Sequence, residues 1–229
     1  MNNLKFSQRG VSLLEILIAM ALSIIIILAM LRAFITTGKV TAESSLGAKV
    51  DSSMMLGFIA ADRILQGIGF GLTNTNAGYG TNFQVLDQEG AAVTLDVTTK
   101  KAVGKFLVWK VSDTHCQALQ SHSNGLYFYG KNTGYSCSSL AKPTDTLSKE
   151  LLVQIESALG TSGISNSINK IGEINIEVKE ISGCLPLGVK NSFSGGGKYQ
   201  VLLTANTFAA SSATSAKTIG NVTCLVNFK

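Results

Sequence analysis

The sequence has little of the residue types on which catalytic and metal sites depend. Its 229 residues include two histidines, four cysteines and one tryptophan, and 14% of them are charged. No two cysteines have the CxxC spacing of a structural zinc site, and His115 and His122 are not spaced as zinc ligands. We therefore expect no metal and no other cofactor.

Enzyme and nucleic-acid-binding motifs are also missing. There is no GxSxG or HExxH motif. The GGGK stretch at 195–198 lacks the first glycine of a phosphate-binding loop, and Tyr199 follows it where Ser or Thr would bind magnesium. The net charge is +5, but no basic run exceeds the pair Lys100–Lys101, whereas a nucleic-acid groove needs clustered Lys and Arg. We expect a protein that is not an enzyme and has no specific nucleic-acid partner.

Proline is scarce, and the absence of early prolines matters most. The chain has two prolines, and the first is Pro143. Ahead of it, an apolar run extends from Val11 to Leu31 with Glu15 as its only charged residue. A run of about 20 apolar residues is long enough to span a bilayer as a helix. Lys5 and Arg9 predict a cytoplasmic N-terminus, and hence a single-pass inner-membrane protein with a periplasmic C-terminal domain.

Glu15 does not suit an ordinary membrane anchor or a secretory signal peptide. A carboxylate in hydrocarbon costs on the order of 2–3 kcal/mol or more, so an ionisable residue there indicates a function. No A-x-A-like cleavage site follows the apolar run, as it would in a signal peptide.

The stretch RG-VSLLE resembles the leader of type IV prepilins, in which a short basic segment ends in Gly and a Glu stands fifth after the cut. The resemblance implies that residues 1–10 are a leader, which a membrane-embedded prepilin peptidase removes between Gly10 and Val11. The same enzyme would then methylate Val11. Valine stands here where the family most often has Phe.

The resemblance also gives Glu15 a role in assembly. Cleavage would create an ammonium at Val11, and Val11 and Glu15 are four residues apart, on one face of a helix. An ammonium and a carboxylate tolerate an apolar medium as a pair far better than singly. In pilins this Glu is thought to meet the N-terminus of a neighbouring subunit, which favours entry into the filament.

The helix is predicted to continue beyond the membrane, over residues 11–68, with a transmembrane part at 11–31 and an amphipathic part at 40–68. Gly38, Gly47 and Gly57 each lower helix propensity by up to about 1 kcal/mol, so we expect local melting or a bend there. The amphipathic part carries an apolar stripe with steps of three and four residues. Its members are Val50, Met54, Phe58, Ala61, Leu65 and Ile68.

The stretch FIAADRILQGIGFG (58–71) resembles the end of the long helix in PilW-type minor pilins. Arg63 directly follows Asp62 here, whereas the family spaces the two by one residue. The resemblance implies a protein that joins other minor pilins, primes assembly and sits at or near the pilus tip. Its partners would be the prepilin peptidase, the inner-membrane platform protein, the major pilin and a tip adhesin.

Two alternatives stay open at this point. A J-type minor pseudopilin of type II secretion shares the leader, the long helix and a bulky domain. A membrane-anchored periplasmic binding module or enzyme would need neither the leader nor Glu15.

The remainder of the chain, residues 69–229, is predicted to form a β-rich domain, so the fold class is α+β with the long helix packed on an antiparallel sheet. One short helix is expected at 146–160. Cys116, Cys137, Cys184 and Cys224 allow three pairings, of which we favour Cys116–Cys137 and Cys184–Cys224 because each pair is close in sequence. Strands are expected at 83–87, 91–97, 105–111, 125–130, 172–181, 198–205 and 221–228.

Overall fold

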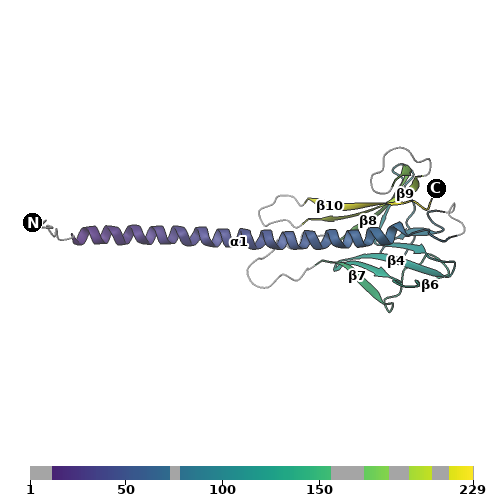
Figure 1. The fold of residues 1–229 in the computed structure, drawn as a ribbon, viewed down its shortest axis with the longest axis horizontal. Coiled ribbons are helices and arrows are strands. Elements are labelled where there is room, and N and C mark those ends of the chain that lie inside the picture. Colours follow the sequence, from purple (N-terminus) through teal and green to yellow (C-terminus); the bar gives the residue numbers. More distant parts are fainter. Residues whose placement is uncertain (1–11, 73–77, 156–172, 186–195, 208–216, 229) are drawn as a thin grey trace, which may run out of the picture. The chain divides into compact units, whose positions relative to one another are not determined.

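The computed structural model describes residues 12–72, 78–155, 173–185, 196–207 and 217–228 (Figure 1). The chain divides into two units, Met1–Leu46 and Gly47–Lys229. One long helix and antiparallel strands make up the described residues, so the α+β class is confirmed.

Helix α1 runs from Leu13 to Gln66, a length of 54 residues, and belongs to both units. The predicted helix at 11–68 is therefore correct to within two residues at each end. The local melting expected at the glycines does not occur, since Gly38, Gly47 and Gly57 are all helical. Gly47 and Gly57 are buried, and there the propensity cost is small beside the packing that stabilises the helix.

Gly57 has a packing role instead. A Cβ at this position would lie 2.1 Å from Val153 Cγ2 and 2.5 Å from the backbone carbonyl oxygen of Leu152. The helix and the strand that contains these residues therefore approach more closely than any side chain would allow. At Gly38 a Cβ would meet nothing within 4 Å.

The strands form two antiparallel sheets. The first has the order β1-β3-β4-β5-β7, with β6 paired to β4, and the second has the order β10-β9-β8-β2. Lys105 N–H, just after β2, donates to the Leu86 carbonyl of β1 (2.9 Å), which joins the sheets at one edge. The bounds are β1 Phe83–Leu86, β2 Lys101–Gly104, β3 Phe106–Lys110, β4 His115–His122, β5 Gly125–Tyr129, β6 Tyr135–Ser136, β7 Lys149–Gln154, β8 Asn175–Cys184, β9 Gly197–Asn206 and β10 Thr218–Leu225.

The helix predicted at 146–160 is wrong over its described part. Residues 149–154 form β7, which pairs with β5 with a register shift between Leu126 and Tyr127. The apolar residues of LLVQI fit a helix or a strand equally well, and pairing with β5 decides between them. Residues 156–160 of the predicted helix lie outside the described residues.

The strand predicted at 91–97 is also wrong. It makes one isolated bridge, Leu86 to Ala92, and one further backbone hydrogen bond to β1, from Val93 N–H to the Val85 carbonyl (2.9 Å). Val93 and Leu95 are half-buried against the core. The alternating pattern therefore predicts correctly which side chains are buried, but it does not predict whether the segment pairs as a strand.

Four strands were not predicted, namely β2, β4, β6 and β7, the last of which was expected to be helical. The sequence of β4, HCQALQSH, has no clear alternation because Cys116 and Ala118 face one buried side and Leu119 the other. A sheet covered on both faces loses the period-2 pattern by which strands are recognised.

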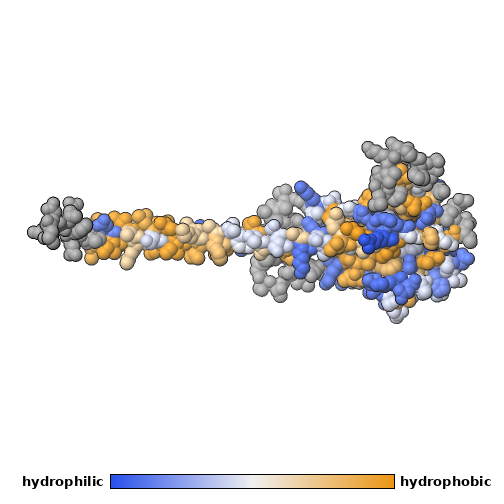
Figure 2. All heavy atoms as spheres, in the orientation of Figure 1, coloured by the Kyte–Doolittle hydropathy of each residue, from blue (hydrophilic) through white to orange (hydrophobic). Residues whose placement is uncertain are grey.

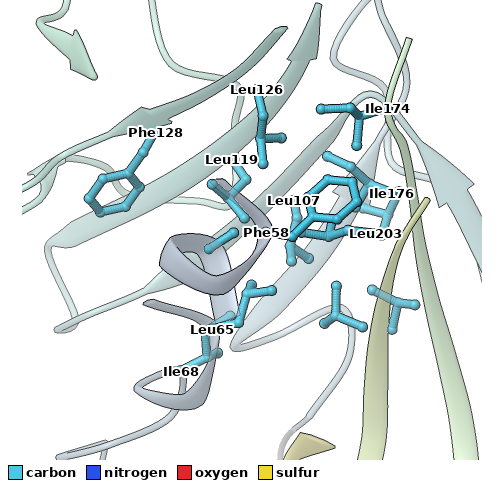
Figure 3. Close-up of a cluster of buried hydrophobic side chains, with 14 of the residues drawn as sticks. Phe58, Leu65, Ile68, Leu107, Leu119, Leu126, Phe128, Ile174, Ile176 and Leu203 are labelled. Carbon is cyan, nitrogen blue, oxygen red and sulfur yellow. The ribbon is translucent and has the colours of Figure 1, made fainter. Parts of the chain in front are cut away.

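A cluster of buried apolar side chains lies between α1 and both sheets (Figure 3). Phe58 and Leu65 from α1 are fully buried, and they pack with Leu107 and Leu119 of the first sheet and Leu203 of the second. The predicted helical stripe is therefore confirmed from Met54 to Ile68, while Val50 is only half-buried.

A second, smaller cluster covers the other face of the first sheet. It includes Phe106, Val108 and Tyr129, with Leu140 and Leu147 packed against it from the segment between β6 and β7. The disulfide Cys116–Cys137 attaches this segment to β4, and Cys184–Cys224 links β8 to β10. These are the two pairs favoured from the sequence.

Candidate functional site in the N-terminal helix

The first half of α1 exposes all of its large apolar side chains. From Leu13 to Ile35 their exposed fractions lie between 48% for Ile16 and 79% for Leu13. Figure 2 shows this apolar surface along the visible side of the helix. Burying one such side chain is worth about 1.5–3 kcal/mol, so this segment favours an apolar environment that the described residues of its own unit do not supply.

By length and composition, α1 is long and apolar enough to cross a membrane, and no residue of its most apolar window is buried. Three hydroxyl groups of this half of the helix bond to its own backbone. The hydroxyl of Ser23 donates to the Ala19 carbonyl at 2.9 Å, and those of Thr36 and Thr37 donate to the carbonyls of Arg32 and Ala33 at the same distance. Such bonding within one helix is what a lipid environment demands.

Glu15 lies in the first turn of α1. The turn begins at Ser12, whose carbonyl accepts hydrogen bonds from the backbone N–H groups of Glu15 (2.9 Å) and Ile16 (3.3 Å). Here the positive end of the helix dipole favours a carboxylate. The next charged residue of the helix is Arg32, so a single acidic group marks the start of the apolar segment. Gly10 and Val11, the predicted cleavage and methylation positions, lie outside the described residues.

The C-terminal end of α1 is held by hydrogen bonds from the C-terminal segment of the chain, and we call it the fastened end of α1. Asp62 accepts hydrogen bonds from the buried Thr223 hydroxyl of β10 and from Gln66 Nε2, the latter at 2.7 Å. Asn227 Nδ2 donates to the Ile68 carbonyl at 2.8 Å, one of the carbonyl groups that follow the last helical turn. Sequence reasoning did not identify Thr223 or Asn227, because nothing local signals a contact across about 160 residues of chain.

The segment 58–71 therefore has structural roles of its own. Phe58, Ala61 and Leu65 are buried, and Asp62 binds Thr223. After the helix, Gly69 has a φ of +84°, and a Cβ there would lie 2.8 Å from the Phe228 ring. This glycine is required both by its left-handed backbone and by the close approach of the ring.

Two tyrosines whose pKa is raised also have structural roles. Burial raises the pKa of Tyr79 to about 12, and its hydroxyl donates to the Val93 carbonyl at 2.5 Å. Burial also raises the pKa of Tyr135, whose hydroxyl donates to the Ala141 carbonyl at 3.0 Å. Among the described residues there is no group of three or more His, Cys, Asp or Glu side chains that could hold a metal ion.

A scan of protein-family models and searches of curated proteins and of solved structures found no match to this chain.

Proposed function

We propose that this chain is a PilW-type minor pilin, a structural protein with no catalytic activity. Residues 1–10 are a leader that a prepilin peptidase removes, after which Val11 is methylated. Before assembly the first half of α1 spans the inner membrane, with the β-rich domain in the periplasm. Afterwards the protein joins other minor pilins and the major pilin at or near the tip, where an adhesin is a further partner.

The observation that carries the proposal is the pairing of Glu15 with an exposed apolar helix. All large apolar side chains from Leu13 to Ile35 are at least 48% exposed, and Glu15 is the one acidic group among them. A bilayer satisfies the apolar side chains but not the carboxylate. A filament core satisfies both, because packed helices bury the side chains and a neighbouring N-terminal ammonium neutralises Glu15.

The fastened end of α1 also supports the proposal. A helix that is pulled out of a membrane into a filament must stay attached to its domain. The hydrogen bonds from Thr223 to Asp62 and from Asn227 to the Ile68 carbonyl provide such an attachment beside the buried apolar stripe.

Mass spectrometry of the N-terminus tests the first step. The full chain is produced in cells that contain a prepilin peptidase, and we expect a mature protein that begins at methylated Val11. Gly10→Val should leave the chain uncut, because it removes the Gly with which the leader motif ends. A wild-type protein that still begins at Met1, or that is cut beyond Leu31, would contradict the proposal.

Processing alone does not separate a minor pilin from a J-type pseudopilin, because both carry the same leader. The location of the processed protein does. We expect it in pili sheared from the cell surface, and its confinement to cells that run type II secretion would favour the pseudopilin.

A further inference from the structure

A pocket of about 340 Å³ lies in the segment between β6 and β7, which covers the outer face of the first sheet. Its volume is within the range of about 300–1,000 Å³ that is usual for small-molecule sites. Neither the membrane-spanning helix nor the fastened helix end contributes to it.

The walls of the pocket are held in place by several independent contacts. Cys137 is bonded to Cys116 of β4, and its backbone N–H donates to the Thr114 carbonyl at 2.9 Å. The Tyr135 hydroxyl donates to the Ala141 carbonyl across the pocket segment at 3.0 Å. A ligand would therefore meet a largely preformed site, which lowers the entropic cost of binding.

The lining has a distinctive chemistry. Four serine and threonine side chains line it, and all four are exposed, namely Ser136, Ser138, Ser139 and Thr144. Lys142 is the only charged residue among the described residues that line it. The Lys142 stem packs against Gly90, where a Cβ would lie 2.9 Å from the Lys142 Cδ.

One side of the pocket is apolar. Leu147 and the Tyr135 ring line it, and both also pack on the smaller buried cluster. Hydroxyl groups, one cation and an apolar wall together suit a small molecule with several hydroxyls, one negative charge and an apolar ring face.

We propose that this pocket binds a carboxylated sugar unit. The carboxylate would pair with Lys142, the sugar hydroxyls would bond to the serine and threonine hydroxyls, and the C–H face would lie on Leu147. This binding activity does not depend on whether the chain enters a pilus.

The test uses the full chain in detergent micelles, with galacturonate as the probe and binding measured by titration with saturation-transfer NMR. We expect galacturonate to bind and Lys142→Gln to weaken binding about tenfold, as for loss of a charge-assisted hydrogen bond. Lys149→Gln is the matched control, because Lys149 lies on the same face of the sheet, over the Tyr127 ring at 4.7 Å, outside the pocket lining. We expect this variant to bind as the wild type does.

A second variant tests the pocket itself rather than its charge. Ser138 is exposed, so Ser138→Trp should fold normally while filling the space. Loss of galacturonate binding in this variant supports the proposal. Equal weakening by Lys142→Gln and Lys149→Gln, unchanged binding by Ser138→Trp, or equal affinity for glucose or inorganic phosphate would each overturn it.

Discussion

The two halves of α1 share one helix but differ in where their apolar side chains go. In the first half, from Leu13 to Ile35, every large apolar side chain is exposed. In the second half a stripe that includes Met54, Phe58 and Leu65 is buried against two sheets. The second half packs within its own unit, whereas the apolar side chains of the first half are exposed.

The difference also appears in the polar residues. Asp62 in the second half is bound by Thr223 of β10. Glu15 in the first half lies in an exposed turn of the helix. The fold explains an acidic residue that has a partner in its own domain. For the acidic residue in the apolar segment we propose a role in assembly.

The largest expected effect on stability comes from the buried stripe. Phe58→Ala removes a fully buried ring and should lower the free energy of unfolding by about 3–5 kcal/mol. Leu56→Ala, two residues away and 66% exposed, should change it by no more than about 0.5 kcal/mol. Urea denaturation followed by the fluorescence of Trp109, which is buried in the core, measures both. Similar losses in the two variants would remove the distinction between the buried and exposed faces of the second half.

The glycines give a sharper comparison, because the same substitution can be made in each half. Gly57→Ala places a Cβ 2.5 Å from the Leu152 carbonyl oxygen and should cost about 2 kcal/mol or more. Gly38→Ala meets nothing within 4 Å and should keep or raise helix stability, by up to about 1 kcal/mol. Helix content and urea midpoints of the full chain in micelles would show the opposite signs. Stabilisation by both variants would contradict the close packing at Gly57.

The smallest loss of stability is expected from removing the hydrogen bond that holds the C-terminal end of α1 to β10. Asp62→Ala leaves the buried Thr223 hydroxyl without its acceptor and should cost about 1–3 kcal/mol. Thr223→Val should cost about 1 kcal/mol. Because the two residues bind each other, the double variant should lose less than the sum of the single losses. Additive losses would mean that the hydrogen bond does not hold α1 to β10.

Much of the helix was predictable from the sequence, because its signals are local. The apolar run, the absence of early prolines and the three-and-four spacing of the stripe gave its bounds and its buried face. The strands were harder. In β4 both faces are covered, and in β7 the apolar residues fit either structure, so only the pairing partners decide.

Some features of the candidate site could also be predicted from local sequence signals, whereas others depend on contacts between distant parts of the chain. Glu15 is visible in the sequence because a lone charge in an apolar run is conspicuous. The bonds of Thr223 and Asn227 to the helix end join residues that are 159 to 161 positions apart, and no local pattern reports them. The disulfide pairs were predictable because each pair is close in sequence and brackets strand-like segments. Only the structure shows how the strands bring the cysteines together.

Incorporation of a Glu15→Ala variant into surface pili tests the central claim most directly, with Glu43→Ala as a matched control that removes the same charge from the same helix outside the apolar run. We expect Glu15→Ala to be cut and methylated normally but to be strongly depleted from sheared pili, while Glu43→Ala is incorporated as the wild type is. Normal incorporation of Glu15→Ala would contradict the claim that this carboxylate pairs with a neighbouring N-terminus during assembly.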